Sequence, residues 1–333
     1  MNKLTKVGIT ALAGSLASFS AHAVEMSAAG SAKVVWNSPD SSEVSGNPMG
    51  MNTSIAFTGS GEVNGYDTTL TIVNNDKNTG LSSASLAVDL GDMGKVTFDQ
   101  GVGAGGISTI DDKTPTANEE VWDGLDAVAS SANGLVGGGN SGVIVYANSM
   151  GDANLSVQVS KGGSVANSDD TRASGSTVSG TSWDFALTSA SLYEGLDAGV
   201  GYGQIANTHQ STAAGDDVNK HGVVYANYTY GMTTFGVTMS EIEDGAEGGQ
   251  DEEAFGFGIA LNINDNLSVS YGERDVDHIN PGASDVEESM EGVAIAYTMG
   301  SAKITLQNNE TSNNGGTTGS NDENTEIALS LSF

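Results

Sequence analysis

Hydrophobic and polar residues alternate along most of this chain, in runs of about ten residues separated by turn-forming stretches. In the last run, Leu329, Leu331 and Phe333 would share one face of an extended strand and the intervening serines the other. Sixteen such runs occur, and we expect a β-strand in each, over residues 26–37, 51–61, 65–74, 81–90, 94–100, 141–148, 153–161, 181–192, 196–206, 221–230, 232–241, 253–262, 266–274, 290–299, 301–309 and 324–333.

The connections between these runs alternate in length. The odd-numbered connections are long, and the longest covers residues 101–140, whereas the even-numbered ones are turns such as EVNG at 62–65 and GDMG at 91–94. An even number of strands with short turns at one end and long loops at the other is typical of an antiparallel up-and-down barrel in an outer membrane. Closure is required because no strand edge can stay unpaired in hydrocarbon. We therefore predict an all-β transmembrane barrel.

The first 23 residues have the pattern of a secretory signal peptide. Lys3 and Lys6 precede an uncharged run over 7–20, and a small-x-small cleavage site follows at Ala21-His22-Ala23. The uncharged run is too short to span a membrane as a helix. We expect cleavage after Ala23 and one barrel domain over residues 24–333.

The chain is strongly acidic, with 42 Asp and Glu against 11 Lys and Arg and a formal net charge of -31. Loss of the two lysines in residues 1–23 would take the charge to -33. This balance excludes nucleic acid as a partner, because nucleic-acid binding needs a basic surface. The sequence has no cysteine, so disulfides and thiolate metal sites are excluded. High charge alone would permit disorder, but the regular alternation does not.

Strand parity assigns the basic residues of the runs to one side of the wall. An Arg or Lys that faces the middle of a bilayer costs about 2–4 kcal/mol. Four basic residues alternate with apolar neighbours in the runs, and we expect them on the inner side or near a rim: Lys33, Lys95, Arg274 and Lys303.

These features together resemble the general diffusion porins of the Gram-negative outer membrane. The most specific pieces are the terminal IALSLSF and the stretch GKVTFDQG, which leads into the third long connection. The resemblance implies a sixteen-stranded, trimeric porin that lets ions and small hydrophilic solutes diffuse passively. It also implies contact with outer-membrane lipid and lipopolysaccharide, and a barrel-insertion machinery that reads Phe333 as an assembly signal. No cofactor, metal or enzymatic activity is expected.

In porins the third long loop folds into the barrel and narrows the pore. Here Thr116 or Asn118 would cap a short helix in that loop, with Val121 and Trp122 on one face. We predict that its acidic residues line the constriction and face the four basic residues of the wall: Asp111, Asp112, Glu119, Glu120, Asp123 and Asp126. The family usually has a dense arginine cluster opposite this loop, whereas this sequence has only Arg172 and Arg274. The departure predicts a preference for cations. The alternative is a solvated external loop whose charges have no effect on the pore.

Aromatic residues are sparse in the first half of the chain. Of the 19 that follow residue 23, six precede residue 178. Because an aromatic girdle forms where a barrel meets lipid headgroups, the thin side is expected to contact protein, as the early strands do in porin trimers.

Two other functions remain open. A substrate-specific channel, for example for sugars, would place aromatic residues along the lumen, and no such run has the lumen parity. A secreted β-rich adhesin or lectin would need neither segregated loop lengths nor a terminal aromatic strand. An enzyme is not expected. The G-x-G-x-x-G match at 101–106 lacks the following helix and strand, no G-x-S-x-G occurs, and the isolated His209, His221 and His278 are expected to be exposed.

Overall fold

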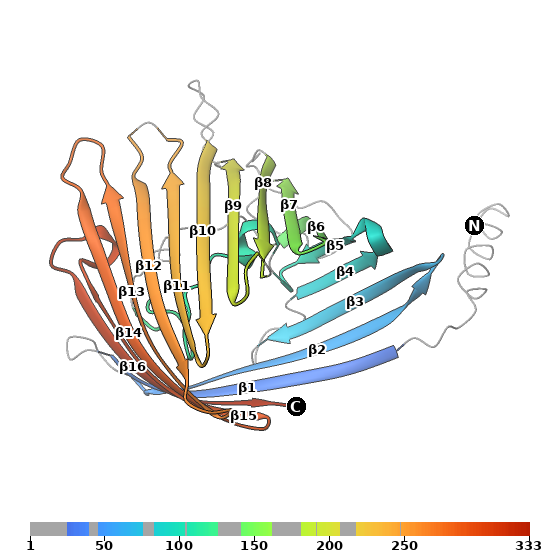
Figure 1. Cartoon of the computed structure of the whole chain (residues 1–333), viewed down its shortest axis with the longest axis horizontal. Coiled ribbons are helices and arrows are strands. Elements are labelled where there is room, and N and C mark those ends of the chain that lie inside the picture. Colours follow the sequence, from blue (N-terminus) through green and yellow to red (C-terminus); the bar gives the residue numbers. More distant parts are fainter. Residues whose placement is uncertain are drawn as a thin grey trace, which may run out of the picture.

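Sixteen antiparallel strands form one closed barrel (Figure 1). The computed structural model describes residues 25–39, 46–75, 83–103, 105–125, 141–161, 181–190, 192–206, 218–246 and 248–333. The strands are β1 (Glu25–Pro39), β2 (Met49–Val63), β3 (Tyr66–Asn75), β4 (Ser83–Asp89), β5 (Lys95–Gln100), β6 (Ser141–Met150), β7 (Ala153–Lys161), β8 (Thr181–Ser189), β9 (Leu196–Ala206), β10 (Val218–Tyr230), β11 (Thr233–Glu243), β12 (Asp251–Asn262), β13 (Leu267–Ile279), β14 (Val286–Met299), β15 (Ala302–Ser312) and β16 (Asn321–Ser332).

Each strand pairs with its neighbours in sequence, and β16 pairs with β1. The predicted all-β, sixteen-stranded up-and-down barrel is confirmed, and every predicted run overlaps one strand. Helical structure in the described residues is limited to three short 3-10 turns, η1 (Gly91–Met93), η2 (Gly106–Thr109) and η3 (Asn314–Gly316). None of the helices described has the length and hydropathy to cross a membrane. The expected signal peptide lies outside the described residues.

The connections alternate in length as predicted. Those at the end where β16 finishes run from two residues (64–65) to six (190–195), and those at the other end from six (280–285) to 40 (101–140). The β2–β3 turn shows how two residues can connect neighbouring strands: Asn64 and Gly65 both have positive φ, 54° and 86°. A two-residue turn of this kind matches the twist of the flanking strands.

The polarity of the two faces of the wall is the reverse of that in a water-soluble protein. Ile295, Leu306 and Ile327 lie side by side on β14, β15 and β16, and they are 43%, 42% and 44% exposed. The alternate positions, such as Gln307 and Ala328, are buried. Large apolar side chains therefore cover the outer face, while small and polar ones cover the inner face.

A row of carboxylates limits the apolar band on the side of β13–β16. Glu273, Glu291, Glu310 and Glu323 are successive cross-strand partners on the outer face. The hydroxyl of Tyr271, one outer position below, lies within hydrogen-bonding distance of Glu273 and, at 2.8 Å, of Glu291 Oε2, so its one proton is shared between the two carboxylates. Four adjacent carboxylates are incompatible with hydrocarbon, so this row marks the level at which the apolar band ends.

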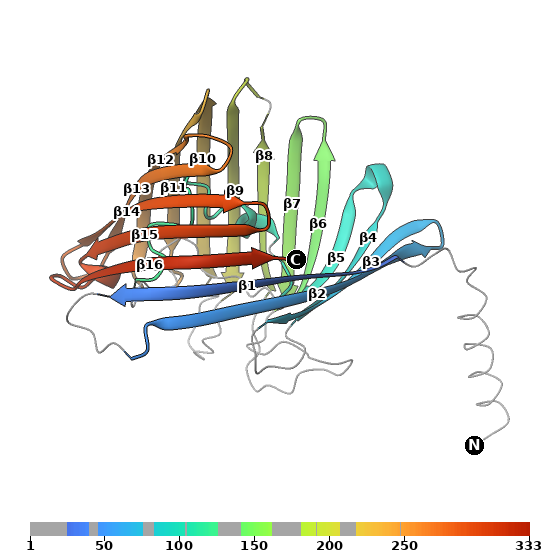
Figure 2. The same cartoon turned by 90° about the horizontal axis from the view of Figure 1, so that it is seen from below.

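The ring closes where β16 meets β1, and in Figure 2 the end of β16, marked C, lies beside β1. Phe333 continues this pairing beyond the strand: its N–H donates to Gly30 O (2.9 Å), and its carbonyl accepts from Gly30 N (2.7 Å). A Cβ on Gly30 would lie 2.5 Å from the Phe333 ring. The ring is therefore packed directly over Gly30, and the last residue of the sequence is part of the seam.

Candidate functional site

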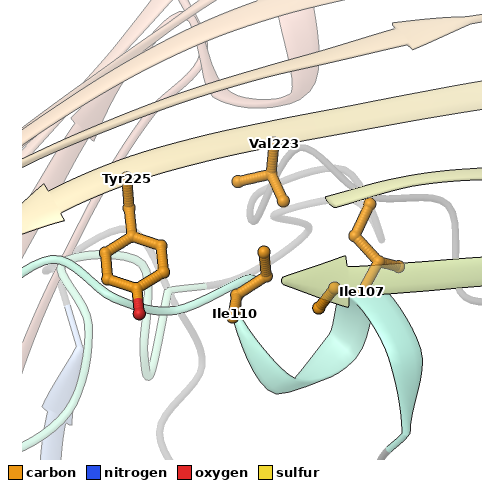
Figure 3. Packing of buried hydrophobic residues seen from close by; sticks show 5 residues of the cluster. Ile107, Ile110, Val223 and Tyr225 are labelled. Carbon is orange, nitrogen blue, oxygen red and sulfur yellow. The ribbon is translucent and has the colours of Figure 1, made fainter. Parts of the chain in front are cut away.

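The described part of the longest connection, residues 105–125, lies against the polar face of the wall. It begins with η2, which packs on β7 to β10. Gly106 N donates to Ser156 Oγ (2.8 Å), and Ile107 N donates to Asp184 Oδ1 (2.7 Å). Ile107 and Ile110 join a buried apolar cluster with Ala186, Val223 and Tyr225, and Figure 3 shows these side chains gathered between η2 and β10.

The rest of this 105–125 segment crosses the strands from β10 to β15. Asn227 Nδ2 donates to Lys113 O (2.7 Å), and Ala117 N donates to Ser270 Oγ (2.9 Å). Gln307 forms the densest contact: its Oε1 accepts from Asn118 Nδ2 (2.7 Å) and from the backbone N–H of Glu119 (3.1 Å). Segment and wall are therefore joined by hydrogen bonds along most of the path.

The helix expected in this segment does not form in its described residues. Thr116 and Asn118 were the expected caps, but beyond them the chain makes two turns, closed by Asp123 N to Glu120 O (3.1 Å) and Leu125 N to Trp122 O (3.3 Å). The Glu120 carbonyl also accepts from Gln307 Nε2 at 2.8 Å. Side chains of the wall thus donate hydrogen bonds to backbone carbonyls that would accept from the helix backbone. These hydrogen bonds between wall and segment override the local helix signal.

Arg274 lies on the inner side of the wall, as parity predicts, but its side chain is buried there and only 1% exposed. Its guanidinium lies 5.1 Å from the centroid of the Trp122 ring, and Nη2 donates to Ser240 Oγ (3.1 Å). A cation stacked on an aromatic face beneath the 105–125 segment ties the segment to the wall.

Two of the expected basic residues also contact the segment. Lys33 Nζ lies 2.9 Å from Glu326 Oε1 and 3.8 Å from Glu119 Oε1. Lys303 Nζ donates to Asn118 Oδ1 at 3.3 Å. Lys33 therefore lies beside an acidic residue of the segment, and Lys303 beside an amide.

Lys95 lines a chamber of about 910 Å3 towards the short-turn end. Lys113 of the 105–125 segment also lines it, together with the carboxylates of Asp89, Asp92 and Asp197. The chamber is thus polar and lined by both signs of charge.

The acidic residues of the segment differ in their exposure. Asp112 is exposed and Glu119 is 44% exposed, whereas Asp111, Glu120 and Asp123 are half-buried. Burial raises the pKa of Glu120 to about 7, and burial together with the neighbouring Asp112 raises the pKa of Asp111 to about 7. Burial also raises the pKa of Asp123, aided by Glu119 and opposed by Lys33. Asp126, the sixth predicted residue, lies outside the described residues.

The histidine prediction was wrong for two residues. His221 and His278 are each only 2% exposed, and His209 lies outside the described residues. His278 Nε2 is 3.0 Å from Glu288 Oε2, and its Nδ1 is 3.5 Å from Glu252 Oε1. Both side chains lie on the covered inner face, which parity alone could have indicated. Within the described ranges, no group of three or more His, Asp or Glu is placed to hold a metal ion.

The family model for Gram-negative porins matches residues 8–316 of the sequence. The chain belongs to the Gram-negative porin family. This porin is therefore an outer-membrane channel. No curated protein sequence matches the chain at a significant level.

Solved structures agree on the fold. The OmpT outer membrane protein of Vibrio cholerae superimposes with a TM-score of 0.67 at 14% identity, over 95% of this chain and 99% of that one. A trimer form of the same protein gives 0.63 at 12% identity, with 93% and 100% coverage. The anion-selective porin of Comamonas acidovorans also gives 0.63 at 12% identity, with 93% and 100% coverage. Identities this low establish the barrel architecture alone.

Sequence reasoning missed the residues that hold the 105–125 segment, chiefly Gln307, Asn309 and Asn227. Asn309 Nδ2 donates to the carbonyls of Glu120 (3.0 Å) and Asp123 (2.8 Å). All three are uncharged residues at inner positions, a common composition for a porin wall. For Asn227 and Asn309 the available signal was their pairing with the inner-face glycines Gly236 and Gly292, which becomes visible only once the register is known. Gln307 pairs with Ala294 and Glu326 and carried no such signal.

Proposed function

We propose that this porin is a cation-preferring diffusion pore, that the 105–125 segment lies across its lumen, and that the acidic residues of the segment set the preference. The supporting observation is the line of hydrogen bonds that joins the segment to the polar face of the wall. Because a closed barrel has its polar face inside, a segment held there narrows the path for solutes.

The charges near this segment favour cations. Asp111, Asp112, Glu119, Glu120 and Asp123 lie on 13 consecutive residues. Lys33 is already paired with Glu326, and Arg274 is buried against Trp122. A narrow path through low-dielectric walls focuses the field of such carboxylates and raises the local concentration of cations. The Comamonas porin is described as anion-selective, so the shared fold does not decide the sign, and we base it on these side chains.

The test is single-channel recording of the refolded porin in a planar bilayer with a salt gradient. We expect discrete conductance steps and a reversal potential of the cation-selective sign. Absence of conductance from heat-modifiable, folded barrels would contradict the channel function. A reversal potential of the anion-selective sign would contradict only the proposed selectivity.

We predict that the cation preference rises with pH around neutrality. A carboxyl whose pKa is raised to about 7, as for Asp111 and Glu120, is neutral below that pH and negative above it. Such a group passes from about 10% to about 90% ionised between pH 6 and pH 8. The reversal potential should therefore move towards the cation-selective limit over this interval. A Glu120→Gln, Asp111→Asn variant should lose most of the pH dependence, and an equal response in that variant would contradict the assignment.

We propose that the porin is a homotrimer joined through β1 and β2. Outer positions there carry small residues, including Ala28 and Ala32 on β1 and Gly59 on β2, which let two walls approach closely. Cross-linking in mild detergent should yield trimers. Ala28→Trp should convert them to folded monomers, whereas Ala226→Trp, on the outer face of β10, should not. Monomers alone in the parent protein would contradict this arrangement.

We further propose that residues 1–23 are the export signal, and that Phe333 is read by the barrel-insertion machinery. Outer-membrane lipid and lipopolysaccharide are the expected surroundings of the apolar band.

A further inference from the structure

A line of glycines crosses the polar face of the wall. The register pairs one residue of each strand with one of the next, from β10 to β15. The resulting row is Asn227, Gly236, Gly258, Gly272, Gly292 and Asn309. Directly paired residues of an antiparallel sheet face the same side, so the four glycines form one shallow channel between two asparagines.

Backbone conformation does not explain these glycines. None of the four has a positive φ, so any residue could adopt the backbone found there. Glycine also weakens a strand, because it loses more entropy on folding and has no side chain to pack. Four of them in adjacent strands at one level therefore indicate a need for space.

The 105–125 segment occupies that space. A Cβ on Gly258 would lie 2.5 Å from Thr114 Cγ2 and 2.7 Å from the backbone oxygen of Pro115. A Cβ on Gly236 would lie 2.2 Å from Pro115 Cδ, and one on Gly272 would lie 2.9 Å from Val121 Cγ1. Carbon atoms in contact are normally about 3.5–4.0 Å apart. A methyl group at Gly258 or Gly236 therefore cannot coexist with the observed position of the segment, and one at Gly272 would displace the Val121 side chain.

The two asparagines complete the arrangement. Asn227 Nδ2 holds the Lys113 carbonyl at one end, and Asn309 Nδ2 holds the carbonyls of Glu120 and Asp123 at the other. Each asparagine Oδ1 also lies 2.1 Å from the place of a Cβ on the adjacent glycine, Gly236 or Gly292. The cavity left between segment and wall is about 20 Å3, room for about one water molecule.

We propose that this asparagine–glycine row is the seat that fixes residues 113–123 and thereby sets the width of the pore. The inference rests on the proposed function, in which the segment lies across the lumen. The depth of the glycine channel then determines how far the segment projects from the wall, and the row is a size-determining element although it does not itself face the path of the solute.

The test compares two glycine variants on one strand. In Gly258→Ala the segment must move by about 1 Å to relieve the contacts, which should lower the single-channel conductance by roughly a third and slow the entry of larger sugars into proteoliposomes. Gly256→Ala is the matched control: its Cβ would lie 3.2 Å from Thr114 Oγ1 and 3.8 Å from its next neighbours, so conductance should stay at the parental value. Heat modifiability of both variants verifies that the barrels are folded.

Two further variants separate the possible failures. Deletion of residues 114–122 should raise conductance, and Gly258→Ala made in that deletion background should have no further effect. Unchanged conductance on deletion would overturn the proposed function itself. Raised conductance on deletion, with parental conductance in Gly258→Ala, would overturn the seat alone. Should Gly258→Ala not assemble, Asn309→Ala removes two bonds to the segment without adding bulk. It should increase current fluctuations in the open pore, and a parental noise level would overturn the seat.

Discussion

Replacing the described acidic residues of the 105–125 segment by amides is expected to remove most of the cation preference that we propose for the pore. The variant carries Asp111→Asn, Asp112→Asn, Glu119→Gln, Glu120→Gln and Asp123→Asn. A perfectly selective pore would give about 59 mV for a tenfold gradient of a monovalent salt. In dilute salt at pH 8 the reversal potential of the parent should have the cation-selective sign, and that of the variant should fall near zero.

Screening sets the conditions for this measurement. The Debye length is about 10 Å at 0.1 M salt and about 3 Å at 1 M, so distant charges affect the ion path only in dilute salt. The preference of the parent should therefore fall steeply between these concentrations. The cation preference that remains near 1 M salt should come from groups within a few ångströms of the ion path. The variant should lose this remaining preference as well.

The outer carboxylate row supplies a matched control for charge. Changing Glu273, Glu291, Glu310 and Glu323 to glutamine removes a similar amount of charge from the opposite face of the wall. This variant should keep the parental reversal potential within a few millivolts. An equal loss in both variants would mean that overall charge, and not the segment, sets the selectivity.

Deletion of Phe333 is expected to reduce the yield of assembled barrel about tenfold or more. The deletion removes both backbone hydrogen bonds with Gly30 and leaves the polar groups of Gly30 without their partners at the seam. Each such bond contributes about 0.5–1.5 kcal/mol in water, and an unpaired group costs more in hydrocarbon. Heat-modifiable barrel in outer-membrane fractions is the measurement.

Phe333→Ala separates the seam from the insertion signal. This change keeps the two backbone bonds and removes only the ring, which is 78% exposed. It should slow assembly in cells but leave the stability of the barrel refolded in detergent close to that of the parent. Phe235→Ala, which removes another exposed outer-face ring, should change neither the rate of assembly nor the stability of the barrel. Normal assembly of the deletion variant would show that neither the seam nor the signal depends on Phe333.

The strands and their facing follow from local sequence. Alternation with period two and strand length are properties of about ten consecutive residues, and lipid imposes them strand by strand. For this reason the sixteen runs, the alternating connections and the inner parity of Lys33 and Arg274 could be predicted. Closure followed as well, since an open edge is not tolerated in hydrocarbon.

The position of the 105–125 segment depends on the tertiary structure. Gly236 and Gly292 are 56 residues apart in sequence and meet the same segment only because the register of four strands, β11 to β14, brings them to one level. The expected helix failed because Gln307 and Asn309, nearly 190 residues away, take its carbonyl groups. Arg274 was placed on the correct face, but its burial under Trp122 depends on the docked segment. Parity is fixed by neighbours along one strand, whereas these contacts arise from register across the barrel, which no short stretch of sequence encodes.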